Sequence, residues 1–288
     1  MELTFDGVLC DCLTKKEIKV LVDDKNQRIE LLRRLGAGSF GVVHSAKIKG
    51  VEGKVAIKIM KKSRNLREMF ILDKIRKAEH CHFILGYQHS FDIGSYIFVV
   101  MEKLDVSLAR LIWRKQVKVD LQAIRIVSTQ ILLGLQHLHS IGILHNDLKS
   151  NNIMLINHEK LPWQLKIIDF GCSSHPDWNQ GSVDFKQSRN FRAPELNLNN
   201  RKEGSEKADL WSHACILLEM IVGKKFFNAK DDIGLSALHY ELMGPPGMEI
   251  RYDNLSYHFN DEELTPQILM QLKDYCTNLE RMHRVLNH

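Results

Sequence analysis

The chain has 288 residues, of which 44% are hydrophobic and 26% are charged. This is the composition of an ordinary globular protein, and the length fits one two-lobed domain or two closely packed ones. The formal charge of +5 is small and spread along the chain, so it gives no reason to expect direct nucleic-acid binding. No apolar run approaches the roughly 18 residues that span a bilayer, and no basic start precedes an apolar block. We therefore expect neither membrane insertion nor secretion.

Cysteine usage agrees with a reducing compartment, the cytoplasm and/or the nucleus. None of the six cysteines forms a C-x-x-C pair, which is the spacing of many redox and zinc sites. The Cys10–Cys12 and His80–His82 segments could be imagined as metal ligands. Neither has the spacing of a zinc knuckle, so we interpret all six as plain thiols.

The N-terminal part of the chain predicts a sheet with one helix. Residues 1–28 carry no motif and are treated as an N-terminal extension. From Ile29 to Met60 the residues alternate and glycines punctuate them, which predicts strands joined by tight turns. Apolar residues at 66, 69, 72 and 75 have helical spacing, and residues 94–103 predict another pair of strand segments.

The rest of the chain is predicted to be mostly helical. Helical patterning starts near Val119, and residues 207–223 are nearly all apolar at their centre, as in a buried helix. A strand-rich part followed by a larger helical part predicts a two-lobed α+β fold with a small antiparallel sheet. We expect the lobes at 29–104 and 105–288, with their junction near 102–106.

A glycine-rich loop opens the predicted sheet. Residues Gly36 to Val43 read G-x-G-x-x-G-x-V, and such glycines let the backbone approach phosphate oxygens and offer amide donors. A dinucleotide-binding loop has a similar string, but a helix follows it. Here the chain continues as a strand and ends it with Val55-Ala56-Ile57-Lys58, fifteen residues past Val43. In isolation Lys58 would be a solvated surface lysine.

Four later segments resemble those of the eukaryotic protein kinase superfamily, serine/threonine type. They are His145-Asn-Asp-Leu-Lys-Ser-Asn-Asn152, Asp169-Phe-Gly171, Ala193-Pro-Glu195 and Asp209-Leu-Trp-Ser212. Each could arise by chance, but their order and spacing over residues 29–288 could not. The resemblance implies the two-lobed protein kinase fold and ATP-dependent phosphorylation of protein substrates.

Finer likenesses concern the branch of the superfamily. The segments Phe191–Glu195 and Asp209–Met220 look like the cyclin-dependent and related proline-directed branch. The compact chain with Asn146 in the catalytic loop also resembles the baculovirus protein kinases, which would place it in a host cell.

The resemblance assigns roles in phosphoryl transfer. Asp147 would accept the proton of the substrate hydroxyl, and Lys149 would neutralise charge on the transferring group. Ser188, seven residues before Glu195, is expected to contact both. Asn152 and Asp169 would hold magnesium, for which manganese could substitute.

It also assigns the phosphate-orienting lysine and its partner. Lys58 would orient the α- and β-phosphates and pair with Glu68 on the predicted helix. The link between them is short for the family. Glu79 is the rival partner, at the end of that helix.

A third set of implied roles concerns the nucleotide. Backbone groups of Glu102 and Leu104 would meet the adenine edge, Met101 would be the gatekeeper and Ser107 could reach the ribose. The full set implied is Leu35, Gly36, Gly38, Gly41, Val43, Ala56, Lys58, Met101, Glu102, Leu104, Ser107 and Met154.

The chain also departs from the family pattern. Asn146 replaces the arginine that usually receives a phosphorylated activation loop, and Asp184 stands where many kinases carry the phosphorylated threonine. We therefore expect activity without loop phosphorylation. Arg284 would be the buried partner of Glu195, and the last family helix would be truncated. A second copy of the chain or another partner could cover the resulting apolar patch.

Two other functions stay open at this point. A silent pseudokinase acting as a nucleotide-binding scaffold would be expected to lack the lysine, the base or the metal ligands. Lys58, Asp147, Asn152 and Asp169 are all present. A small-molecule kinase is disfavoured by Ala193-Pro-Glu195, which supports a peptide-docking loop in the family.

Overall fold

The computed structural model describes residues 20–114, 119–178, 187–198 and 204–243. The chain divides into two compact units, the first ending at Phe226 and the second beginning at Phe227. Within the described residues, no helix has the length and apolar character needed to cross a membrane.

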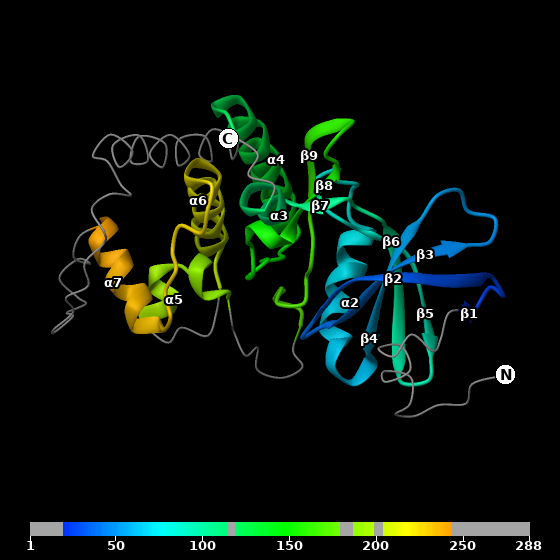
Figure 1. The fold of residues 1–288 in the computed structure, drawn as a ribbon. Coiled ribbons are helices and arrows are strands. Elements are labelled where there is room, and N and C mark those ends of the chain that lie inside the picture. Colours follow the sequence, from blue (N-terminus) through cyan, green and yellow to red (C-terminus); the bar gives the residue numbers. More distant parts are fainter. Residues whose placement is uncertain (1–19, 115–118, 179–186, 199–203, 244–288) are drawn as a thin grey trace. The chain divides into compact units, whose positions relative to one another are not determined.

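The strands of the first unit form two antiparallel sheets (Figure 1). The larger sheet has the order β1-β2-β3-β4-β6-β5, and the smaller one has the order β7-β8-β9. Their bounds are β1 (Val20–Val22), β2 (Arg28–Gly38), β3 (Gly41–Ile48), β4 (Val55–Lys61), β5 (Tyr87–Ile93), β6 (Tyr96–Glu102), β7 (Val106–Ser107), β8 (Ile153–Asn157) and β9 (Leu161–Ile167).

Side-chain caps fix where several helices begin. Asp120 accepts a hydrogen bond from the amide of Ala123, and Ser205 accepts one from that of Ala208, so two long helices start where the sequence offers an acceptor. The helices are α2 (Lys62–Lys77), α3 (Leu108–Trp113), α4 (Leu121–Ser140), α5 (Pro194–Leu198), α6 (Glu206–Val222) and, in the second unit, α7 (Asp232–Met243). Short 3₁₀ turns lie at Ser150–Asn152 and Arg189–Phe191.

The larger sheet begins before residue 29. β1 pairs with β2 and buries Leu21, so part of the expected N-terminal extension belongs to the sheet. Three residues are too short to give a periodic signal, which explains why the sequence showed no strand there. Asp23, just after β1, lies 3.4 Å from the Nε2 atom of His89 on β5. The two edge strands therefore approach each other, and the sheet is curled.

One apolar cluster fills the curled sheet. It takes side chains from every one of its strands, from Leu21 on β1 to Phe91 on β5. Phe91 and Phe98 stack with ring centroids 5.1 Å apart. Because alternate residues of a strand face the same side, this cluster turns the other residues of β3 and β4 toward the rest of the unit.

Helix α2 begins four residues earlier than the apolar spacing predicted. It follows β4 directly and bends at Asn65, whose backbone is not helical and whose amide nitrogen donates to the carbonyl of Lys61. This direct entry explains the short link between Lys58 and Glu68, because the helix needs no separate connecting loop.

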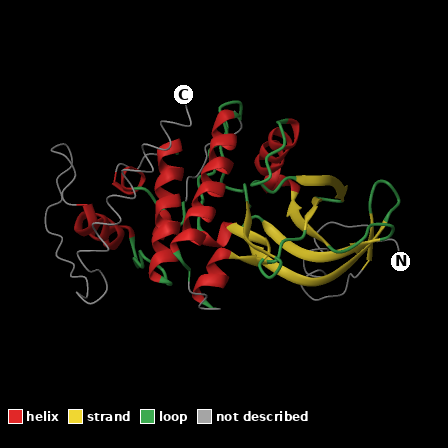
Figure 2. Cartoon of the chain, turned by 90° about the horizontal axis from the view of Figure 1, so that it is seen from above, coloured by secondary structure: helices red, strands yellow, loops and turns green. Residues whose placement is uncertain are grey.

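Both the strand-rich part and the helices up to α6 belong to the first compact unit, and the lobe bounds expected at 29–104 and 105–288 stay predictions. Figure 2 shows the yellow strands and the long red helices in separate regions, with α4 and α6 side by side. The two regions are joined where Leu85 donates to the carbonyl of Ile167 (3.0 Å) and Ile167 donates to that of Phe83 (2.8 Å). These backbone bonds fix β9 against the connection that follows α2.

The described part of the second unit is short. Asp231 accepts hydrogen bonds from the amides of Gly234 and Leu235 at the start of α7. Phe227 and His239 meet edge to face, with ring centroids 5.0 Å apart.

Candidate active site

The glycine-rich loop is a tight hairpin between β2 and β3. Gly38 pairs with Gly41, which leaves Ser39 and Phe40 at the turn. Gly41 has a φ of +137°, and a Cβ atom there would lie 2.3 Å from the carbonyl oxygen of Ile59. Only glycine fits such a position, since both the backbone angle and the space exclude a side chain. The hairpin is thus held close over β4.

Phe40, which the sequence did not single out, reaches from this turn toward two site residues. A Cβ atom on Gly171 would lie 2.5 Å from the Phe40 ring, so the ring packs directly against that glycine. The Lys58 ammonium lies 5.9 Å from the centre of the same ring. The loop tip therefore covers the charged groups below it.

Those charged groups are Lys58, Glu68 and Asp169. The Lys58 Nζ atom lies 2.5 Å from Glu68 Oε1 and 3.0 Å from Asp169 Oδ1, and both Lys58 and Glu68 are buried. Burial alone would lower the pKa of Lys58, but the two carboxylates outweigh it and raise that pKa. The structure thus joins Lys58 to Glu68, while the rival Glu79 lies exposed beyond the end of α2.

Asp169 adopts a left-handed backbone, with a φ of 66°. Burial opposes its ionisation, yet the neighbouring Lys58 ammonium prevails and lowers the pKa of this carboxyl. Asp169 therefore stays charged at neutral pH. An ionised carboxylate offers the oxygen ligands that a divalent cation such as magnesium prefers.

The residues predicted to form the catalytic loop meet in one network with Ser188. The Asp147 carboxylate accepts from the Ser188 amide at 3.0 Å and from Lys149 Nζ at 2.6 Å, and Lys149 also donates to Ser188 Oγ at 2.9 Å. The amide nitrogen of Asn152 donates to the carbonyl of Asp147 at 2.9 Å. All four residues expected here from the sequence are brought together.

The amides and carboxylates present fit magnesium. Because the Asn152 amide nitrogen is committed to Asp147, its oxygen is the atom left for a cation. The carbonyl of Asn152 accepts from the amide of Ile168 at 2.9 Å, which ties this residue to the one before Asp169. Magnesium prefers such oxygen ligands and completes its shell with water and phosphate. Within the ranges that the structure describes, no three His, Cys, Asp or Glu side chains gather as a metal site of their own.

Asp209 positions the catalytic loop from below, a role that its motif alone did not reveal. Its side chain is fully buried in α6 and accepts from the backbone amides of His145 and Asn146, both at 2.9 Å. His139 lies 3.0 Å from the same carboxylate. A charged group at this depth needs such partners, so the carboxylate fixes the backbone just before Asp147.

The residues expected around the adenine lie on neighbouring strands. Ala56 of β4 pairs with Met101 of β6, and Ser107 of β7 pairs with Met154 of β8. The Ser107 hydroxyl accepts from the amide of Arg110 and so also caps α3. Of the other predicted contacts, Leu104 is buried and Leu35 is 40% exposed.

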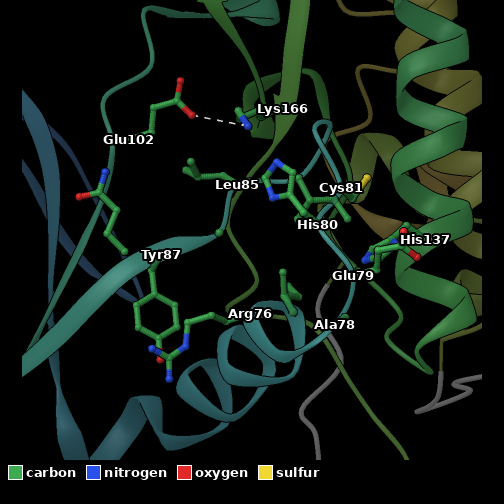
Figure 3. A pocket seen from close by; sticks show the side chains of 14 residues that line it. Arg76, Ala78, Glu79, His80, Cys81, Leu85, Tyr87, Glu102, His137 and Lys166 are labelled. Carbon is green, nitrogen blue, oxygen red and sulfur yellow. Dashed lines mark ion pairs between the residues drawn. The ribbon is translucent and has the colours of Figure 1, made fainter.

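A separate pocket of about 290 Å³ lies between α2, the connection to β5 and residues of α4 and β9 (Figure 3). Of the residues expected to bind nucleotide, Glu102 alone lines it, together with Lys166 and His137. Lys166 Nζ lies 3.5 Å from Glu102 Oε2. This ion pair ties the strand that leads to Asp169 to the end of β6.

Two residues named from the sequence, Asp184 of the predicted activation loop and Arg284 near the C-terminus, lie outside the described residues.

Comparison with known proteins shows the family of the chain. A family model for the protein kinase domain matches residues 29–285. The chain therefore belongs to the protein kinase family.

Three similar proteins illustrate the likeness. Homeodomain-interacting protein kinase 1 of Caenorhabditis elegans is 34% identical over 213 residues, covering 71% of this chain and 25% of that protein. Mitogen-activated protein kinase sty1 of Schizosaccharomyces pombe is 36% identical over 229 residues, which cover 76% of this chain and 62% of that protein. Probable serine/threonine-protein kinase glkA of Dictyostelium discoideum is 31% identical over 252 residues, which cover 84% of this chain and 51% of that protein. The chain thus spans less than two thirds of each. The likeness to viral kinases stays a prediction.

Proposed function

We propose that this chain transfers the γ-phosphoryl group of ATP to serine or threonine hydroxyls of protein substrates. The observation that carries the proposal is the Asp147 network. One oxygen of the carboxylate accepts from Ser188 and the other from Lys149, so the group is held in place beside a cation. General bases act only when fixed within hydrogen-bond reach of the proton they take.

The reaction would proceed as a direct transfer. The substrate hydroxyl oxygen attacks the γ-phosphorus, the bond to the bridging oxygen breaks, and ADP leaves. Asp147 takes the hydroxyl proton, and Lys149, which bonds both Asp147 and Ser188, offsets charge on the phosphoryl oxygens. Most of the acceleration would come from positioning and electrostatics.

The nucleotide would be held from the opposite side. Lys58, kept charged by Glu68 and Asp169, is placed to orient the α- and β-phosphates. Asn152 and Asp169 would hold magnesium, which neutralises phosphate charge when bound. The glycine hairpin would offer backbone amides to the phosphates.

The test is transfer from γ-labelled ATP to a mixed peptide library, with products identified by mass spectrometry. We expect phosphoserine and phosphothreonine, and a fall of at least 10²-fold in rate for Asp147→Asn, since general bases contribute about that much or more. Asp92→Asn, which changes an exposed carboxylate on β5, is the matched control and should leave the rate unchanged.

The scaffold alternative makes a different forecast. A nucleotide-binding pseudokinase would be stabilised by Mg-ATP yet transfer no label with the wild-type chain. Stabilisation of the chain by Mg-ATP therefore does not distinguish an active kinase from a pseudokinase. Equal rates for wild type and Asp147→Asn would refute the assignment of the base.

A further inference from the structure

The segment that follows Asp169, residues 171–178, lies between two elements that must both be in place for transfer. On one side is α2, which carries Glu68. On the other is the stretch from Gly142 to Asn146, just before the proposed base. Side chains make most of the contacts with α2, and backbone groups join those with the Gly142–Asn146 stretch.

On the α2 side, three side chains of one helix face reach this segment. Arg67 donates to the carbonyl of Gly171 at 2.8 Å, and Lys74 Nζ lies 2.6 Å from Asp177 Oδ2. Between them, the Phe70 ring packs against Trp178, with ring centroids 5.3 Å apart. Positions 67, 70 and 74 fall on one stripe of a helix, so α2 presents a continuous contact.

The same phenyl ring links the helix to the other side. Phe70 meets the ring of His175 edge to face, at 5.7 Å between centroids. A Cβ atom on Gly142 would lie 3.3 Å from Nε2 of that histidine, so His175 packs closely on the end of α4. His175 is therefore enclosed between the helix that carries Glu68 and the helical part of the unit.

Near the catalytic loop, backbone and amide bonds anchor the segment. Leu144 and Ser174 exchange both backbone hydrogen bonds, at 3.1 and 3.0 Å. Asn146, with a φ of 63°, donates from its side-chain amide to Ser174 Oγ at 2.9 Å and to the carbonyl of Cys172 at 3.3 Å. An uncharged side chain thus holds the segment where the family has an arginine.

We propose that residues 171–178 act as a latch that keeps α2 positioned so that Glu68 meets Lys58 without any phosphate on the chain. Phe70, Lys74 and Trp178 are then positioning residues of the transfer reaction. The inference rests on the proposed function and adds how its charged pair is maintained. Removing latch contacts should let α2 move away and should lower turnover more than substrate affinity.

The first test is Phe70→Ala, with Leu66→Ala as its control, because Leu66 is on the same helix but 53% exposed. We expect kcat to fall about tenfold for Phe70→Ala, since two aromatic contacts are lost, with the peptide KM changed less than about twofold. Phe70→Tyr should restore turnover. Leu66→Ala should behave as wild type.

The second test reverses the ion pair. Lys74→Asp should lower kcat about two- to fivefold, and adding Asp177→Lys should restore it. The control is the ion pair between Lys62 on α2 and Asp92 on β5, which are 2.7 Å apart. This pair also joins α2 to another element, but that element is not the latch. Reversing that pair, singly or doubly, should not affect kcat.

Hydrogen exchange of α2 separates this proposal from the proposed function. Phe70→Ala, but not Leu66→Ala, should speed amide exchange in α2, even if the wild-type chain transfers no phosphate. If the wild-type chain transferred no phosphate, that result would therefore refute the proposed function but not the latch. The latch would be refuted if Phe70→Ala and Lys74→Asp left amide exchange in α2 unchanged. In an active enzyme, kcat would also have to be unchanged in both variants.

Discussion

A buried carboxyl under the catalytic loop should make stability fall as pH rises. Glu219 on α6 is 2% exposed, and its Oε2 atom accepts from the Ser150 hydroxyl at 2.6 Å. Burial raises the pKa of Glu219 to about 7 from its ordinary value of 4.5, against the opposing effects of Ser150 and Lys225. The folded chain therefore holds this proton more tightly than the unfolded chain does.

The sign and size of the effect follow from linkage. Below about pH 4.5 the carboxyl is protonated in both states, so the stability that this group contributes is fully present there. That contribution is lost as pH rises from about 4.5 through about 7, because folding must then bury a charge. The gap between the two pKa values corresponds to about 3 kcal/mol of unfolding free energy.

Glu219→Gln removes the charge and keeps an oxygen that can accept from Ser150. We expect the variant to be more stable than wild type by about 1–3 kcal/mol at pH 8 and nearly equal to it at pH 4.5. The lower bound allows for a new amide N–H that needs a partner.

The assay is denaturant unfolding of both proteins at several pH values from 4.5 to 8. Other titrating groups are common to both, so the difference between the two free energies isolates Glu219. Glu159→Gln, at an exposed position, is the control for removing a carboxylate. A difference that stays flat with pH, or a Glu219→Gln variant less stable than wild type at pH 8, would show that the reasoning is wrong.

Three further predictions concern the site. Gly41→Ala should lower the free energy of unfolding by about 1–3 kcal/mol and remove most of the activity. Gly36→Ala, with nothing within 4 Å of its Cβ position, should change the free energy of unfolding by less than about 0.5 kcal/mol. Thermal melts and transfer rates check both variants. Phosphatase-treated protein, verified by mass spectrometry, should keep its turnover because Asn146 offers no cationic partner for a phosphate; a large loss would contradict this. Products should be phosphoserine and phosphothreonine because Lys149 follows the base, and a majority of phosphotyrosine would overturn that forecast.

The family and most of the site could be predicted from local strings. The spacing of the glycines at 36, 38 and 41 suits a loop whose backbone approaches phosphate groups. The spacing of the residues around Asp147 and Asp169 suits proton transfer and metal binding. The protein kinase domain match and the two-lobed fold confirm the class that those strings predicted. The roles of the individual residues stay predictions.

Other features had no signal in the sequence because they depend on long-range contacts. The three-residue strand β1 is too short to show a period, and the early start of α2 is hidden by a bend at Asn65. Likewise, Asp209 could be noticed in its motif, but its two bonds to the catalytic-loop backbone could not.

The sequence by itself determined which chemical groups this protein has and in what order, because phosphate, metal and proton-transfer chemistry demand particular side chains at fixed local spacings. Only the tertiary structure decided which of them meet. It paired Lys58 with Glu68 rather than Glu79, since helix direction and burial choose between two carboxylates eleven residues apart in one segment. It also placed Phe70 against Trp178, a contact across more than a hundred residues that no local pattern encodes.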